Sequence, residues 1–288
     1  MFGFLNINKP QGMTSHDVVS VLRKITHIKQ IGHTGTLDPL ATGVLPIAIG
    51  KASRLIEYLN EDKAYIAKLQ FGVISDTFDS EGNIEKYSEK QVTQEDLLQN
   101  IEKFKGDIEQ VPPAHSAVHY KGKRLYELAR KGIIPDDIPK RKVTITKLEL
   151  LEFDETNQTA MLEIACSKGT YIRSIVNDLG MELGPGAVMT ALQRIKSGLF
   201  TIDTAIDLED LKEPEQVQKN LINPLEVLSY RQRELSQKEY DDVSHGRFIK
   251  TSEYKNNELV SLTLNNKLCA IAQKSGEEEK LSVRKVFI

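Results

Sequence analysis

Apolar residues at every second position mark the strands of the larger part of this chain. The alternation is clearest from 64 to 73, and it returns at 143–153 and 159–166. This two-residue period buries one face of a strand and exposes the other. A short apolar run at 2–7 predicts a further strand near the N-terminus. We therefore expect half-buried strands to form the framework of this region.

Apolar residues three and four positions apart predict four helices among these strands, and a further short helix is predicted through Leu125 and Leu128. Three of them follow residues that suit a helix N-cap, namely Ser15, Thr93 and Thr170. Thr93 is followed by Asp96 in the pattern of a capping box. The fourth helix is predicted near 188–195. The residues expected to face the core are Val18, Leu22, Ile25, Leu97, Leu98, Ile101, Phe104, Ile172, Ile175 and Leu179.

The pattern changes near Ser229 and divides the chain into two units, 1–228 and 229–288. In the second unit, Ser236 and Glu239 suit the start of a short helix. Strands at 259–264 and 267–272 flank Asn265-Asn266, a dipeptide typical of a tight hairpin, and a last strand is predicted at 283–288. The whole chain is thus expected to be α+β, with a small β domain at its C-terminal end.

Composition describes an ordinary globular chain of 288 residues, with 40% hydrophobic and 27% charged residues. It has no apolar run long enough to span a bilayer and no signal-peptide pattern. The two cysteines, Cys166 and Cys269, are far apart in the sequence. We therefore expect a reduced, cytoplasmic protein without a metal site.

The net charge of −3 does not by itself suggest a polyanionic partner, but the distribution of charge does. Residues 115–147 carry nine Lys or Arg against three Asp or Glu, whereas 203–215 carry six acids and one lysine. A basic segment can bind nucleic acid in a protein that is acidic overall. Lys121, Arg124 and Arg130 are its candidate phosphate ligands, and a solvated helix and loop is the equal alternative.

The stretch from 31 to 51 has the composition of a ligand-binding loop. It holds four glycines and two prolines, and Asp38 is its single acidic residue. Dense glycines let a backbone turn sharply and approach a ligand. An isolated Asp-Pro is typical of a capped turn. A lone carboxylate among apolar residues, with no second acid nearby in the sequence, is also how a nucleophile is presented, so both interpretations stay open.

The stretch C-S-K-G-T-Y-I-R, residues 166–173, is the second informative one. Arg173 falls in the first turn of a predicted helix, where the helix dipole disfavours a cation. Such a charge often has an anionic partner, and a phosphate or a carboxylate from elsewhere in the fold would serve. An exposed arginine tolerated at small cost is the alternative of equal weight.

The loop sequence G-H-T-G-T-L-D-P-L-A-T-G-V-L-P closely resembles the signature of the pseudouridine synthases, and specifically of the bacterial TruB family. The similarity continues in order through most of the chain. It includes Lys9-Pro10-x-Gly12, K-x-Y at 63–65, P-P-x-x-S-A at 112–117, C-S-K-G-T-Y-I-R and L-x-R at 192–194. The resemblance implies a mixed, mainly antiparallel sheet with flanking helices over 1–228, and a PUA-like RNA-binding domain over 229–288.

The resemblance also implies an activity. The family isomerises uridine 55 in the T loop of tRNA to pseudouridine, by base flipping and covalent catalysis by an aspartate, and a tRNA-folding role is a further hypothesis. Whether the carboxylate adds to C6 of the base or acts at the ribose stays open. No metal, nucleotide or redox cofactor is expected. The expected partner is the tRNA T stem-loop, bound by a monomer without a membrane or a protein partner.

Individual roles follow from the matching motifs. Asp38 is implied to be the catalytic residue, Tyr65 to pack against the target base and assist proton removal, and Arg173 to pair with Asp38. His33 is implied to fill the space that the flipped nucleotide leaves. The remaining RNA-binding residues implied are Tyr171, Leu192 and Lys9.

Two positions depart from the family pattern: His115 stands where tyrosine is expected, and Gln193 where arginine is common. Both concern local RNA contacts and lie outside the catalytic set. A non-catalytic RNA-binding or tRNA-folding protein is one alternative to the enzyme, and a relative guided by small RNAs is another. The non-basic terminal sequence G-E-E-E-K-L-S-V-R-K-V-F-I favours the stand-alone bacterial type.

Overall fold

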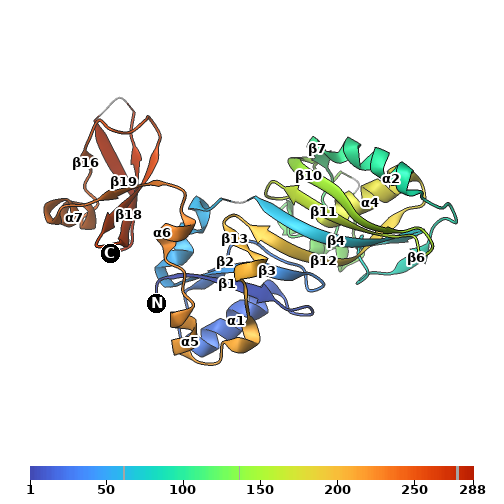
Figure 1. Ribbon diagram of the computed structural model, residues 1–288, viewed down its shortest axis with the longest axis horizontal. Coiled ribbons are helices and arrows are strands. Elements are labelled where there is room, and N and C mark those ends of the chain that lie inside the picture. The colour runs from blue at the N-terminus through green and yellow to red at the C-terminus, as the bar shows by residue number, and fades with distance from the viewer. Residues whose placement is uncertain (61, 136, 277–278) are drawn as a thin grey trace.

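A mixed sheet runs through the larger part of the molecule (Figure 1). The computed structural model describes residues 1–60, 62–135, 137–276 and 279–288, so Asp136 of the basic segment and Glu277 and Glu278 of the terminal sequence lie outside the described residues. Within them, ten strands form the sheet, in the order β14-β1-β3-β12-β4-β11-β10-β7, with β2 on β3 and β13 on β12. β1 pairs with β14, and β3 with β12, in parallel; the other pairs are antiparallel. The expected mixed, mainly antiparallel sheet is confirmed.

The strands of this sheet are β1 (Gly3–Lys9), β2 (Ile31–His33), β3 (Thr42–Ile49), β4 (Lys63–Phe71), β7 (Gly106–Gln110), β10 (Arg141–Asp154), β11 (Thr159–Cys166), β12 (Ala187–Ser197), β13 (Phe200–Thr201) and β14 (Ile206–Asp207). Two short hairpins lie outside it, β5 (Val73–Ser75) with β6 (Ile84–Lys86) and β8 (His119–Tyr120) with β9 (Lys123–Arg124). The flanking helices are α1 (Ser15–Thr26), η1 (Gly50–Tyr58), α2 (Gln94–Ile101), η2 (Glu102–Phe104), α3 (Leu125–Ala129), α4 (Ile172–Leu183), η3 (Ile202–Thr204), η4 (Leu208–Asp210), α5 (Pro214–Lys219) and α6 (Pro224–Val227).

The helix predicted near 188–195 is wrong, because these residues belong to strand β12 in the middle of the sheet. β12 is bulged twice against β4, between Met189 and Ala191 and between Arg194 and Lys196. Each bulge inserts an extra residue and interrupts the alternation of side chains. The buried residues Val188, Met189 and Leu192 consequently acquire a helix-like spacing.

The helix caps also differ from two of the predictions. Thr14, not Ser15, caps α1, in a capping box with Asp17. Tyr171, not Thr170, is the N-cap of α4, and no side chain caps that end. The predicted capping box of Thr93 and Asp96 is confirmed for α2. Of the residues predicted to face the core from α2, Leu97 and Ile101 are buried, whereas Leu98 is exposed.

A second sheet forms the C-terminal part, in the order β15-β17-β18-β19-β16. Its elements are β15 (Arg231–Glu234), α7 (Gln237–Ser244), β16 (Ile249–Lys250), β17 (Leu259–Leu264), β18 (Lys267–Lys274) and β19 (Lys280–Val286). Asn265 and Asn266 both have positive φ, +51° and +58°, which confirms the predicted hairpin turn. The sheet has its own core around Val260, Leu262 and Ala270.

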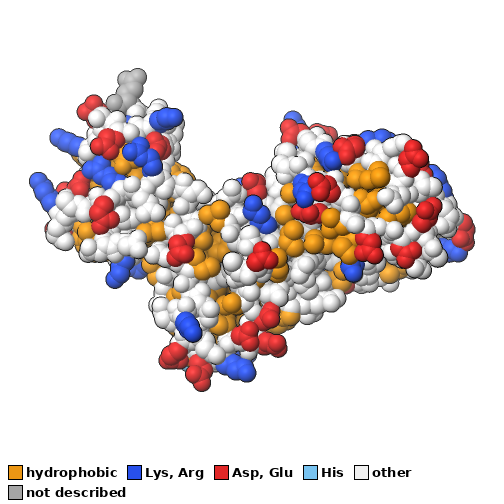
Figure 2. Space-filling model, in the orientation of Figure 1, with side chains coloured by type: hydrophobic (Ala, Val, Ile, Leu, Met, Phe, Trp, Pro, Cys, Tyr) orange, Lys and Arg blue, Asp and Glu red, His pale blue; other side chains and the backbone are white. Residues whose placement is uncertain are grey.

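The two sheets meet through a shared apolar cluster. Phe4 and Val44 of the large sheet, Leu55 of η1 and Ile271 and Phe287 of the C-terminal part are buried together. The C-terminal sheet therefore packs beside β1 and β3, the second of which leads out of the glycine-rich loop (Figure 1). Figure 2 shows a recess between it and the far lobe of the large sheet.

Candidate active site

The glycine-rich loop between β2 and β3 is held in place by side chains from other elements. Ser15 of α1 accepts a hydrogen bond from the Leu37 amide at 2.8 Å and donates one to the Leu37 carbonyl at 3.2 Å. On the other side of Asp38, the Pro39 carbonyl accepts hydrogen bonds from the Gly12 amide at 2.8 Å and from Lys9 Nζ at 3.4 Å. The Asp-Pro turn closes through a 3.0 Å bond from the Ala41 amide to the Asp38 carbonyl. A loop without regular structure is thus fixed on both sides of its single acid.

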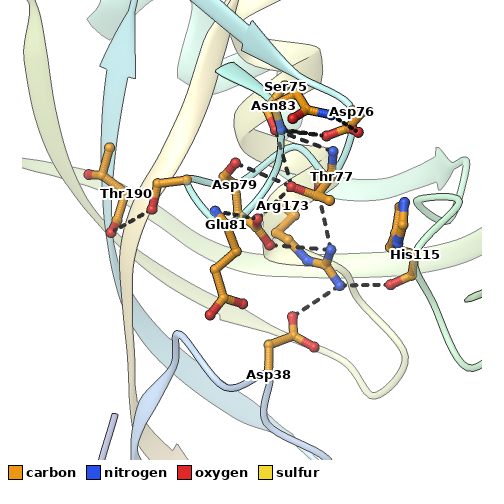
Figure 3. A network of polar contacts seen from close by, with 11 residues as sticks. Asp38, Ser75, Asp76, Thr77, Asp79, Glu81, Asn83, His115, Arg173 and Thr190 are labelled. Atoms are coloured by element: carbon orange, nitrogen blue, oxygen red, sulfur yellow. Dashed lines mark hydrogen bonds and ion pairs between the residues drawn. The ribbon is translucent and has the colours of Figure 1, made fainter. Parts of the chain in front are cut away.

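Asp38 forms an ion pair with Arg173, the expected partner. The Arg173 Nη2–Asp38 Oδ2 distance is 3.0 Å, and the two side chains are 7% and 36% exposed (Figure 3). The other Nη atom of Arg173 lies 3.3 Å from Asp79 Oδ2, and the Asp79 side chain is only 3% exposed. One buried guanidinium therefore joins a buried carboxylate to a solvent-facing one.

Backbone carbonyls complete the surroundings of Arg173. Nη1 donates to the Thr77 carbonyl at 3.0 Å, and Nη2 donates to the His115 carbonyl at 3.1 Å (Figure 3). The first turn of α4, which carries Arg173, is fixed by Gln110 of β7, whose side chain bonds both the amide and the carbonyl of Tyr171. These contacts offset the unfavourable position of a cation at a helix N-terminus.

Tyr65 lies in β4, opposite Arg194 of β12 in the sheet register. The Tyr65 side chain is buried, and burial raises the pKa of its phenol, whereas the charge of Arg194 and a hydrogen bond from it act in the opposite direction. The negative charge of Asp38 makes a small further contribution that raises this pKa. Leu192, two residues before Arg194, is buried in the main core. Asp38 and Arg173 thus meet from two distant segments, and Tyr65 lies across from Arg194 in the neighbouring strand pair.

His33 and Tyr171 lie at the edges of this site. His33 ends β2, just before the loop, and its Nδ1 is buried without a hydrogen-bond partner among the described residues. Burial, together with the charges of Arg194 and His16, lowers the pKa of His33. Tyr171 is half-buried, with the Arg141 guanidinium 5.8 Å from the centre of its ring.

Lys9, predicted to bind RNA, does not reach solvent. Its side chain is fully buried at the end of β1, and Nζ donates to the carbonyls of Pro10 at 2.9 Å, Met13 at 2.5 Å and Pro39 at 3.4 Å. The prediction is therefore wrong for this structure: Lys9 supports the backbone next to Asp38 instead of facing a phosphate. Nothing in the sequence around Lys9 predicts that its side chain turns back into the core.

The burial of Lys9 predicts a dependence of stability on pH. Burial lowers the pKa of Lys9 from 10.5 to about 8, and the charges of Asp38 and Glu81 oppose this only in part. Between these two values the unfolded chain holds a proton that the native protein has lost, so the free energy of unfolding should rise with pH across this window. Urea unfolding at both ends of the window should show the rise in the unaltered protein and not in Lys9→Met. The control Lys24→Met, at an exposed lysine of α1, should keep it; an identical pH profile in Lys9→Met would contradict the expectation.

The three basic candidates of the 115–147 segment lie on the small β8–β9 hairpin and helix α3. Lys121 is exposed at the hairpin turn, 3.5 Å from Asp137. Arg124 donates to the Ala117 carbonyl at 2.6 Å, and Arg130 is exposed beside the Tyr126 ring. The His115 carbonyl, which contacts Arg173, joins the start of this segment to the site.

Sequence reasoning missed Asp79, Glu81 and Arg194. The first two lie in the connection between β5 and β6, which the Arg173–Asp79 ion pair joins to the site although it is far from Asp38 in the sequence. Partial burial, followed by the charges of Asp79 and Asp38, raises the pKa of Glu81. Arg194 belongs to the quoted L-x-R motif, which was the available signal for it.

Gly43 is required where the loop enters β3. Its φ is +94°, and a Cβ there would lie 2.3 Å from the Arg194 carbonyl oxygen on the neighbouring strand. Gly12 has a similar φ of +84°, but a Cβ there would meet nothing within 4 Å. Gly12→Ala should therefore lose only the conformational strain, about 1 kcal/mol, and Gly43→Ala about 3 kcal/mol or more in urea unfolding. Equal losses would show that the contact with β12 is unimportant.

Neither a metal-binding cluster nor a membrane-spanning helix is found among the described residues. Across the described residues, no group of three or more His, Cys, Asp or Glu side chains is placed to hold a metal ion. No helix in the described part of the chain has both the length and the apolar character needed to cross a membrane.

The chain matches two models of a known enzyme family. The model of the TruB family pseudouridylate synthase N-terminal domain matches residues 23–172, which include Asp38 and Tyr65. The chain belongs to the TruB family. A second model, of the tRNA pseudouridylate synthase B C-terminal domain, matches residues 173–229 and begins at Arg173. As a TruB-family pseudouridylate synthase, the protein is an isomerase that acts on RNA.

Individual relatives agree with this placement in the TruB family. The chain is 40% identical to tRNA pseudouridine synthase B of Clostridium tetani, with 98% of each chain covered. It is 42% identical to the protein of the same name from Lactobacillus johnsonii, covering 96% of this chain and 95% of that one. Among solved structures, a Cbf5-Nop10-Gar1 complex matches with a TM-score of 0.75 and 27% identity, covering 100% of this chain and 85% of the other.

Proposed function

We propose that this TruB-family enzyme converts uridine 55 in the T loop of tRNA into pseudouridine, with Asp38 as the covalent catalyst. The observation that carries this proposal is the ion pair of Asp38 and Arg173, in which a buried guanidinium holds a carboxylate that remains 36% exposed. A catalytic group has to be both fixed and accessible to its substrate. The relatives named tRNA pseudouridine synthase B support tRNA as the substrate.

The chemistry requires the target nucleotide to leave the RNA stack, at a cost of about a few kcal/mol. The bond between N1 and C1′ then breaks with Asp38 as the covalent group, the uracil rotates, and C5 bonds to C1′ as the C5 proton leaves. Tyr65 packs against the base and assists this proton removal. Leu192 and Tyr171 border the base, and His33, with its unpartnered Nδ1, occupies the space left in the RNA.

Phosphate contacts offset the cost of base flipping. Lys121, Arg124 and Arg130 lie on the segment that starts at His115, beside Arg173, which supports a backbone-binding role for them. Binding through such contacts weakens as salt rises, because bound counterions are released. The same grip on the T arm supports a tRNA-folding role in addition to catalysis.

A cleft in the C-terminal part supports an RNA-binding role for 229–288. It measures about 690 Å³ and lies between α7, β16 and β19. The half-exposed ring of Phe248 lies at this cleft beside the Lys280 ammonium, 5.3 Å from the ring centre. Aromatic rings next to cations stack on bases and bind phosphates. The other basic residues that line the cleft are Lys238, Arg247 and Lys250.

Arg173 and both of its carboxylate partners come from one chain, which supports a monomer. The relatives that modify tRNA support a cytoplasmic location.

The experiment that tests the proposal uses a T-arm RNA with tritium at C5 of its uracils. Isomerisation removes the hydrogen from C5, so the protein should release tritium from position 55 and none from a matched RNA with cytidine there. Release that persists from the cytidine RNA would contradict the proposed position. Tight RNA binding with no release from either RNA would favour a non-catalytic RNA-binding or folding protein.

A further inference from the structure

Arg194 is a fully buried arginine at the centre of the large sheet. Its strand, β12, runs between β3 and β4, and its register partners are Gly43 on one side and Tyr65 on the other. It therefore stands between the strand that leaves the glycine-rich loop and the strand that carries Tyr65.

The Arg194 guanidinium binds the glycine-rich loop at three points. Nε donates to the Val44 carbonyl at 2.7 Å, Nη2 to the Gly35 carbonyl at 3.1 Å and Nη1 to the Thr36 carbonyl at 3.4 Å. Two of these carbonyls precede Asp38, and the third follows the loop. The planar fork of an arginine is suited to holding several acceptors in a fixed geometry, which the ammonium of a lysine does not reproduce.

The charge of Arg194 is costly in this place. Burying an ionised group without a counter-charge costs several kcal/mol, and apolar side chains of similar size often replace even paired charges without loss of stability. No Asp or Glu in the described part of the chain forms an ion pair with Arg194. Its hydrogen bonds go to backbone carbonyl oxygens, and Tyr65 is its neighbour across the β12–β4 pair. Packing alone therefore does not account for an arginine at this position.

The positive charge of Arg194 acts on the phenol of Tyr65. Burial raises the pKa of the Tyr65 phenol, while the positive charge of Arg194 and its hydrogen bond lower it. The same arginine thus contacts the backbone on both sides of Asp38 and is the cross-strand neighbour of Tyr65, the second residue of the proposed catalytic set. Arg173, in contrast, pairs with the Asp38 carboxylate itself.

We propose that Arg194 is a positioning residue for the isomerisation, which sets the direction of the Tyr65 hydroxyl and fixes the 35–44 backbone on which Asp38 stands. This inference rests on the proposed function, because it assigns Arg194 to the same reaction. Arg194 is buried below the loop and touches no substrate itself. Its contribution acts through Tyr65 and Asp38.

The test compares Arg194→Met, which removes the charge at similar volume, with Arg194→Lys, which keeps the charge without the fork. Lys196→Met, at an exposed position of the same strand, is the matched control. The first readout is the ultraviolet titration of tyrosines, with Tyr65→Phe to assign the Tyr65 signal. Arg194→Met should raise the Tyr65 pKa, Arg194→Lys should raise it less, and Lys196→Met should leave it unchanged.

The second readout separates rate from binding. In single-turnover tritium release, Arg194→Met and Arg194→Lys should slow the reaction about 100-fold or more, with T-arm affinity kept within about threefold, since small misplacements of reacting groups cost this much. An unchanged Tyr65 titration, or a rate that falls only in proportion to affinity or folded fraction, would overturn the proposal. If Arg194→Met does not fold, Arg194→Lys decides by the same criteria. Because the Tyr65 titration needs no RNA, it decides on Arg194 even if the proposed isomerase activity fails.

Discussion

Replacing Asp38 with asparagine is expected to abolish tritium release from the T-arm RNA. The change keeps the size of the side chain and replaces the nucleophilic carboxylate with a neutral amide, which does not form the covalent bond. The rate should fall by about 10⁴-fold or more, the size of loss expected when an enzyme loses its covalent catalyst. Binding of the T arm, measured by filter retention, should change little, because the backbone bonds that fix the loop do not involve the Asp38 carboxylate.

The matched control for this variant is Asp76→Asn, at an exposed acid of the connection that carries Asp79. It should retain the rate of the unaltered protein. Equal release from Asp38→Asn and the unaltered protein would show that the family assignment of Asp38 is wrong. Loss of release together with loss of RNA binding would point to a damaged loop instead of a missing catalyst.

Replacing Arg173 with methionine is expected to lower both stability and activity. Asp79 would keep its bonds from Thr77 and the Glu81 amide but would lose its cation while its side chain stays 3% exposed. Removing one partner of a buried ion pair typically costs about 3–5 kcal/mol, which urea unfolding would measure. Tritium release should fall as well, because Asp38 loses the guanidinium that holds it in place.

A double variant separates the two effects of this change. Asp79→Asn combined with Arg173→Met removes the unpaired buried charge, so it should regain part of the stability and none of the activity. Arg233→Met is the control, since its ion pair with Glu239 is 2.7 Å long but partly exposed, at 20% and 27%, and should contribute about 1 kcal/mol or less. Similar losses in Arg173→Met and Arg233→Met would mean that burial does not strengthen the Arg173 network.

Local signals in the sequence predicted many elements of the fold correctly. Strands β10 and β11 follow the two-residue alternation, because each buries one face. The α2 capping box and the Asn265-Asn266 hairpin depend on residues next to one another in the chain. The glycine-rich loop was recognisable for the same reason, since its glycines and its single acid lie within one short segment.

Local signals failed wherever a partner strand or a distant segment determines the outcome. β12 has the apolar spacing of a helix, and only its bulged pairing with β4 makes it a strand. Lys9 looked like a surface cation, and only the fold encloses it with three carbonyls. Asp79 lies in the connection between β5 and β6, and only the folding of that connection onto α4 brings it to Arg173.

The sequence by itself determined which reactive groups this protein has. They are the single carboxylate of the glycine-rich loop, a tyrosine on a strand with alternating apolar residues, and an arginine in the first turn of a helix. Only the tertiary structure decided how these groups are held. Buried charges require partners, and those partners, Asp79 for Arg173 and the loop carbonyls for Arg194 and Lys9, lie far away along the chain. No local pattern encodes such contacts, because they exist only once the sheet has brought its strands together.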